Sequence, residues 1–189
     1  MMLLSGVMGE GISDWSRFER LTPFRVRDVL LVASHFDHYL LEESGYLAEI
    51  MQEEYSDLNL SQAPRIIHSP DARDALRLLS TREFDLVITM TRVGEMDVKA
   101  FGTEAKRVIK GLPVVMLSHN TRELATLSAG DGIDRIFVWT GDSRILLSIC
   151  KLIEDERNVE NDVRDGDVQV ILLVEDSRRF YSAYLPLLY

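Results

Sequence analysis

The chain has 189 residues, of which 46% are hydrophobic and 28% are charged, a balance typical of a globular protein. Its formal net charge is −10 and no basic run carries interleaved aromatic residues, which argues against a nucleic-acid-binding surface. No apolar run approaches the roughly 20 residues that span a membrane. The one cysteine, Cys150, allows no disulfide within the chain. We expect a soluble, cytoplasmic protein with one domain of ordinary size and part of a second.

Residues 1–24 form a lead-in without a strong pattern. The first clear element is the apolar run 28–33, which is typical of a strand buried on both faces. A helix is predicted from about residue 37 to residue 55, and a short strand follows over 65–69. Asp71 is expected to cap the next helix by accepting hydrogen bonds from its first N–H groups. The buried face of that helix is predicted to comprise Ala72, Ala75, Leu76 and Leu79.

The middle of the chain continues the alternation of strands and helices. The apolar stretch 85–90 runs into a glycine-containing loop, and a helix is predicted to begin near Asp97. A glycine and a proline end that helix, and a strand is predicted over 113–118. A short helix over about 121–129 then leads to a strand over 135–139.

A last helix of this unit is predicted from near Asp142. Its buried side chains are predicted to be Ile145, Ile149, Leu152 and Ile153. Strands of the buried type that alternate with helices imply a parallel, doubly wound α/β sheet covered on both faces. In such sheets the working site lies beyond the carboxyl ends of the strands.

The C-terminal part begins a second unit. The strongly charged stretch 156–167 is predicted to be the end of the last helix running out into a linker. Strand character returns in 168–174, where residues 171–174 repeat the pattern of residues 29–32. One strand and one helix over 168–189 cannot build a core, so we expect this chain to be an N-terminal piece of a longer protein. We expect this segment to pack on the first unit or to pair with another copy, giving a homodimer.

Several segments resemble the receiver domain of two-component response regulators. The stretch 171–177 is similar to the first strand of that family with its acidic pair, here Glu175 and Asp176. Residues 85–97 resemble the third strand and the loop that follows it. Residues 112–118 resemble the fourth strand, which ends in a small hydroxyl residue.

The resemblance covers about residues 28–155, with the start of a second copy at 168–189. It implies a flavodoxin-like, CheY-like sheet of five parallel strands in the order 2-1-3-4-5, with helices on both faces. The receiver-like domain is expected over 25–155. More weakly, residues 132–189 resemble the N-terminal regions of large phosphoenolpyruvate synthase-like proteins, which bears on context only.

The residues that carry the chemistry of that family are replaced in the first unit. In the family, a carboxylate ending the third strand accepts a phosphoryl group, two acids of the first strand hold magnesium, and a lysine ends the fifth strand. Here the acceptor position falls on Met90 and the lysine position on Trp139. The acidic pair falls on Ala33 and Ser34, and only Ser118 fits, as the hydroxyl of the fourth strand. The resemblance therefore implies a pseudo-receiver that is not an enzyme and binds neither magnesium nor another cofactor.

Two nearby carboxylates are weighed as replacements. Asp37 is expected within a helix and Asp97 as a helix cap, so neither is expected to accept a phosphoryl group. The expected function is regulation through protein partners or the rest of the chain, with homodimerisation through the segment 168–189 or through the face formed by the fourth and fifth helices. Neither nucleic acid nor membrane is expected as a partner.

Three alternatives stay open. The unit could be a structural spacer for the second receiver, or it could sense a small molecule at the strand ends, although no glycine-rich phosphate motif is present. The third alternative is a metal site in which His35, His38 and His119 approach one another.

Overall fold

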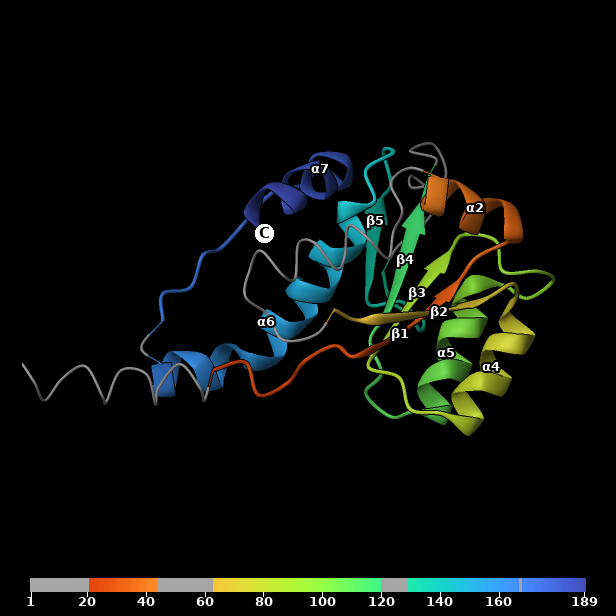
Figure 1. Cartoon of the computed structure of the whole chain (residues 1–189), viewed down its shortest axis with the longest axis horizontal. Helices are drawn as coiled ribbons and strands as arrows, with labels where there is room; N and C mark the ends of the chain where they lie inside the picture. Colours follow the sequence, from red (N-terminus) through yellow and green to blue (C-terminus); the bar gives the residue numbers. More distant parts are fainter. Residues whose placement is uncertain (1–20, 44–62, 120–128, 167) are drawn as a thin grey trace, which may run out of the picture.

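One parallel sheet with helices on both faces organises the protein. The structure is a computed structural model that describes residues 21–43, 63–119, 129–166 and 168–189. Its strands are β1 (Asp28–Val32), β2 (Arg65–Ser69), β3 (Leu86–Met90), β4 (Val114–Ser118) and β5 (Arg135–Val138). All neighbours pair in parallel in the order β2-β1-β3-β4-β5 (Figure 1). The predicted flavodoxin-like sheet and its strand order are confirmed.

The helices cover the two faces of the sheet. They are α2 (His35–Glu43), α4 (Ala72–Thr81), α5 (Val98–Val108), α6 (Arg144–Gly166) and α7 (Arg178–Leu188). Helices α4 and α5 lie on one face, and α2 and α6 lie on the other (Figure 1). The helix predicted for 37–55 begins at His35 and is described as far as Glu43. The rest of it, and nearly all of the helix predicted over 121–129, lies outside the described residues.

Alternation along β1 divides the core into two layers. Val29 and Leu31 join the apolar cluster beneath α2 and α6, whereas Leu30 and Val32 join the cluster beneath α4 and α5. Every residue of β3 and β4 is buried, as expected for central strands of a sheet covered on both sides. Each fully buried aliphatic side chain contributes about 1.5–3 kcal/mol, so the sheet and its two apolar layers hold the fold together.

Carboxylate caps set the start of two helices. The side chain of Asp71 accepts hydrogen bonds from two N–H groups in the first turn of α4, at 2.8 and 2.9 Å. Asp97 does the same for α5, at 3.0 and 3.1 Å. Both predicted caps are confirmed, and each satisfies N–H groups that have no partner within the helix. Of the predicted buried face of α4, Leu76 is only partly buried.

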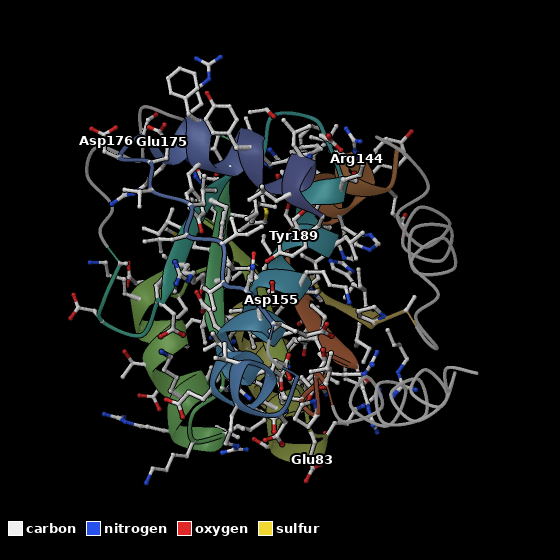
Figure 2. The ribbon with its side chains drawn as sticks, turned by 90° about the vertical axis from the view of Figure 1, so that its left-hand side faces the viewer. Glu83, Arg144, Asp155, Glu175, Asp176 and Tyr189 are labelled. Atoms are coloured by element: carbon white, nitrogen blue, oxygen red, sulfur yellow. The ribbon has the colours of Figure 1, made fainter. Side chains whose placement is uncertain are left out.

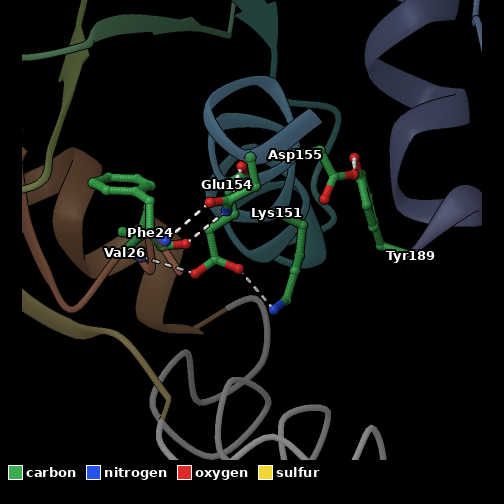
Figure 3. Close-up of polar contacts among 7 residues, drawn as sticks. Phe24, Val26, Lys151, Glu154, Asp155 and Tyr189 are labelled. Atoms are coloured by element: carbon green, nitrogen blue, oxygen red, sulfur yellow. Dashed lines mark hydrogen bonds and ion pairs between the residues drawn. The ribbon is translucent and has the colours of Figure 1, made fainter. Parts of the chain in front are cut away.

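Helix α6 is longer than predicted. It runs for 23 residues to Gly166, so the charged stretch 156–166 is helical and is not a linker. The helix continues because polar side chains on it, spaced four residues apart, form hydrogen bonds with the backbone of the N-terminal segment. Glu154 Oε1 accepts a hydrogen bond from Val26 N at 2.8 Å, and Asn158 both accepts from and donates to the backbone of Phe24, at 2.9 and 2.8 Å (Figure 3).

The third member of this set is Asp162, which accepts a hydrogen bond from Thr22 N at 2.9 Å. Residues 22–26 therefore run along α6 with their alternate N–H groups bonded to its side chains, although they lie outside the sheet. Lys151 neutralises Glu154 at 2.9 Å, which offsets the cost of burying that carboxylate (Figure 3). The last part of the predicted lead-in is thus tied to the domain.

The predicted strand 168–174 does not form. These residues belong to no strand, and Ile171, Leu172 and Val174 are more than 80% exposed. The expected helix does form, as α7, and it packs on α6 and β5. A strand requires a neighbour to pair with its N–H and C=O groups, and α7 already lies against β5, next to the free edge of the sheet.

Candidate functional site

Four strands end at one edge of the sheet, where the residues that the sequence resemblance aligned with the receiver site lie together. Ala33 directly follows β1, Met90 ends β3, Ser118 ends β4 and Trp139 directly follows β5. The parallel register places Met90 beside Leu117 and Ser118 beside Val138, so the strand ends are level. All four residues are buried.

Apolar side chains fill the middle of this edge of the sheet. Met90 is 1% exposed and belongs to the same apolar cluster as Ala33 and Trp139. A thioether sulfur is a weak acceptor and carries no charge, whereas magnesium requires hard oxygen ligands in near-octahedral geometry. The side chains at the ends of β1, β3 and β5 therefore offer no charged oxygen to a divalent cation and no ammonium group to a phosphoryl group.

A series of hydrogen bonds joins Ser34, Asp37 and His119 at this edge of the sheet. Ser34 Oγ donates to Asp37 Oδ2 at 2.8 Å, and Asp37 Oδ1 lies 3.1 Å from His119 Nε2. Asp37 N also donates to Ser34 Oγ at 3.1 Å, which fixes the first turn of α2. The carboxylate stands between the hydroxyl and the imidazole. A nucleophilic serine needs the imidazole as its direct partner, so this order does not activate Ser34.

The contact between Asp37 and His119 was missed from the sequence. The metal hypothesis grouped His119 with two other histidines, and it did not consider a carboxylate of α2 as its partner. The contact joins α2, which follows β1, to the residue after β4, although β3 separates these two strands in the sheet. The spacing of Ser34 and Asp37, three residues apart at a helix start, is the only signal that the sequence offers.

Trp139 occupies the end of β5. Its ring meets the ring of His119 edge to face, with centroids 4.8 Å apart. Its Nε1–H is buried and has no hydrogen-bond partner among the residues that the structure describes. A buried donor without an acceptor costs free energy, so this group marks a position where an acceptor oxygen would be stabilising.

The other three histidines gather at the neighbouring edge of the sheet. The rings of His38 and His68 stack with centroids 3.9 Å apart, and His35 meets His68 edge to face at 5.6 Å. His68 Nε2 bonds to the carbonyl oxygen of Ala33 at 2.8 Å. Burial lowers the pKa of His38 from its usual value, and the neighbouring His68 lowers it further, while Glu42 opposes the shift.

These rings do not form the metal site that was left open as an alternative. His119 bonds to Asp37, and the ring that lies beside those of His35 and His38 is that of His68. Stacked imidazoles direct their nitrogen lone pairs side by side and not toward a common point. Within the described ranges, no group of three or more histidine, cysteine or acidic residues is arranged to hold a metal ion.

The acidic residues of the expected second unit lie at the start of α7. Glu175 Oε1 accepts a hydrogen bond from Ser177 N at 2.8 Å, and Ser177 Oγ in turn caps the helix by accepting from Phe180 N. Asp176 is exposed. Figure 2 shows both acids at the N-terminal end of α7, at the outer surface of the molecule. In this chain Glu175 helps to set the start of α7.

Helix α7 covers the side of β5. Ser182 Oγ accepts a hydrogen bond from Val138 N at 2.9 Å, which satisfies a backbone donor at the open edge of the sheet. Tyr189 donates its hydroxyl to Asp155 of α6 at 2.7 Å, as Figure 3 shows, and Leu185 is buried between the elements. Burial, followed by the hydrogen bond to Asp155, raises the pKa of Tyr189 above its usual value. Part of the face expected to mediate homodimerisation is therefore occupied by the chain itself.

Solved structures share this architecture. A CheY-like response regulator receiver domain from Methanospirillum hungatei covers 71% of this chain and 98% of its own length, at 18% identity and a TM-score of 0.54. The fold is that of a receiver domain. A receiver domain protein from Clostridium thermocellum covers 71% of this chain and 99% of its own, at 14% identity and a TM-score of 0.53. A chemotaxis response regulator from Vibrio cholerae covers 68% and 98%, at 18% identity and a TM-score of 0.51.

The likeness to receivers concerns the fold. Neither a family model nor a curated protein matches the sequence. Within the part of the chain that the structure describes, no helix is both long enough and apolar enough to cross a lipid bilayer. In this structure β3 ends at Met90, the residue that the sequence resemblance aligns with the phosphoryl acceptor.

Proposed function

We propose that this receiver fold is a regulatory and interaction domain of a two-component-type signalling protein, located in the bacterial cytoplasm, and that it acts without phosphorylation. The observation that carries the proposal is the buried thioether of Met90 at the end of β3. The domain then signals through the surfaces it presents to protein partners or to the rest of its own chain. Phosphoryl transfer and magnesium binding play no part in it.

The neighbours of Met90 support this proposal. Ala33 has no functional group, and the hydroxyl of Ser34 is bonded to Asp37. Trp139 brings a bulky neutral ring to the position where an ammonium group would pair with phosphoryl oxygens. An acidic pair, an acceptor and a lysine act together, so the loss of all of them removes the basis for phosphotransfer.

The nearby carboxylates already take part in other hydrogen bonds. Asp37 is engaged by both Ser34 and His119, and Asp97 caps α5. Asp85, which precedes β3, accepts hydrogen bonds from the N–H groups of Arg27 and Asp28 at the opposite end of the sheet. These contacts support the inference that none of the three replaces the missing acceptor.

Phosphodonor treatment tests the proposal. The chain is incubated with magnesium and acetyl phosphate, or with magnesium and beryllofluoride, and its intact mass and Tm are measured. A receiver with a complete acidic pair, treated in parallel, is the positive control. We expect no phosphoryl adduct and no change in Tm for this chain. A phosphoryl group found on Asp37, Asp85 or Asp97 by peptide mass spectrometry would overturn the proposal.

A second candidate function is supported by the Nε1–H of Trp139, which is buried and lacks an acceptor within the described part of the chain. A small molecule with a carbonyl or carboxylate oxygen could bond there, at the edge where doubly wound sheets bind ligands. Trp139 fluorescence reports on this site directly. Metabolite mixtures that shift the fluorescence of the chain, but not that of the Trp139→Phe variant, would favour sensing over a purely protein-binding role.

A further inference from the structure

Helix α7 sits on a surface that fits it closely. We call this surface the α7 seat: it comprises Phe137 and Val138 of β5 and Asp155 of α6. The ring of Tyr181 lies 6.0 Å from the ring of Phe137, Ser182 bonds to Val138 N, and Tyr189 bonds to Asp155. One side of α7 is therefore buried and hydrogen-bonded.

The segment that joins α6 to α7 contrasts with the helix. The path of residues 168–176 runs outside the body of the molecule, and the chain returns to it at α7 (Figure 1). They form no strand and make no backbone hydrogen bond to the sheet among the described residues. Val170, Ile171, Leu172 and Val174 are all exposed. We call residues 168–176 the bridge.

The exposed bridge is unusual for a protein surface. It combines an uncharged, strand-forming stretch, Val168–Val174, with backbone groups that pair with no strand among the described residues, and such edges are templates for pairing with another chain. The outer side of α7 adds Phe180, Tyr184, Leu187 and Leu188, which are also exposed. Most of the large exposed hydrophobic side chains among the described residues lie in the C-terminal part of α6, the bridge and α7.

We propose that two copies of the chain exchange α7, so that each helix occupies the α7 seat of the other copy and the two bridges pair as antiparallel strands. The seat already fits this helix, so the exchange retains every contact between α7 and the domain. Only the path of the bridge changes, which makes exchange of an identical element a low-cost route to a dimer. The pairing satisfies backbone groups and buries aliphatic side chains that the monomer leaves in water.

The reach of the bridge is sufficient for the exchange. A fully extended chain spans about 3.3–3.6 Å per residue, so the bridge can cover roughly 30 Å. Helix α6 also carries the start of the bridge outward, because its last turns extend beyond the sheet (Figure 1). The joining segment is thus long enough to reach a second copy without unwinding either helix.

Cross-linking distinguishes exchange from other association. One chain carries Asp155→Cys, the other carries Tyr189→Cys, and the two are co-expressed and treated with a short bismaleimide. Exchange predicts a covalent dimer containing one chain of each kind. Burial raises the pKa of the native Cys150 thiol, so the unmodified chain serves as an unreactive control. A chain with both substitutions is expected to give covalent dimers, and in the closed monomer it would give only an intramolecular link.

Light scattering over a range of concentrations supplies the second measurement. We expect a dimer that dissociates on dilution, and at least a tenfold weaker dimer for Ile171→Lys, whose side chain is exposed in the monomer. Phe36→Lys, at another exposed apolar site, on α2, is the matched control and is expected to leave the dimer unchanged. A monomer at every concentration, or a dimer without the mixed cross-link, would overturn the proposal. Neither result bears on the proposed function, which is tested by phosphodonor treatment.

Discussion

Asp37 of α2 and His119, the residue after β4, meet at 3.1 Å across the end of β3. They bridge the ends of two strands that are not neighbours in the sheet, and the buried Met90 lies at the end of the strand between them. In a working receiver, this region holds a cation and a phosphoryl group. Here the carboxylate of Asp37 and the imidazole of His119, both groups of the chain itself, bond to each other in this region.

The first prediction concerns the strength of this bridge. A double-mutant cycle with Asp37→Asn and His119→Gln is expected to give a coupling energy of about 0.2–1 kcal/mol, because both side chains are partly exposed to solvent. Urea unfolding of the four proteins measures it. Coupling that is indistinguishable from zero would show that the contact does not hold α2 to the end of β4.

The second prediction concerns Met90. Met90→Asp places a carboxylate in an apolar cluster without a partner, so the free energy of unfolding is expected to fall by about 3 kcal/mol or more. Met90→Leu keeps the volume and polarity of the site and is expected to cost less than about 1.5 kcal/mol. Urea unfolding compares the two variants.

Phosphodonor treatment of Met90→Asp extends the second prediction. We expect no phosphoryl adduct, because Ala33 and Ser34 still leave magnesium without carboxylate ligands. An adduct on the new aspartate would mean that the acidic pair is dispensable on this fold. The lack of carboxylates at Ala33 and Ser34 would then no longer exclude phosphorylation.

The third prediction concerns the segment held by α6. Asn158→Ala removes the partner of both the N–H and the C=O of Phe24, and buried groups left unpaired cost about 1–3 kcal/mol each. We therefore expect a loss of roughly 2 kcal/mol or more in urea unfolding, together with faster hydrogen exchange in residues 22–26. Glu160→Ala, two residues further along α6 and exposed, is the matched control and is expected to change stability by less than about 0.5 kcal/mol.

The fourth prediction concerns pH. The pKa of His38 is lowered from 6.5, chiefly by burial, so the unfolded chain binds this proton more readily than the folded protein does. The contribution of His38 to stability is therefore complete above the usual pKa. It is lost as the pH falls from 6.5 toward the lowered value. Urea unfolding between about pH 5 and pH 8 is expected to show this slope, and His38→Gln is expected to reduce it.

A change at the neighbouring ring provides the control for the fourth prediction. His68→Gln removes the neighbouring imidazole that lowers the pKa of His38 but leaves the burial of the His38 ring. We expect this variant to keep most of the slope. An unchanged slope in His38→Gln would assign the pH dependence to other groups.

The sequence by itself determined the strands, their parallel arrangement and two helix caps. Uninterrupted apolar runs such as residues 86–90 identify strands buried on both faces, and the single carboxylates Asp71 and Asp97 identify helix starts. These features depend on neighbouring residues, whose types and spacing can be read directly. The strand order followed from the resemblance to receivers and not from spacing.

Tertiary structure decided the contacts between distant segments. Only the folded chain brings Asp37 to His119, extends α6 to Gly166 through its hydrogen bonds to residues 22–26, and seats α7 against β5. It also leaves the predicted strand 168–174 without a neighbour, because a strand forms only where a second one pairs with its backbone. Local sequence propensity predicts a strand such as this one, but the strand forms only where a neighbouring strand is available to pair with it.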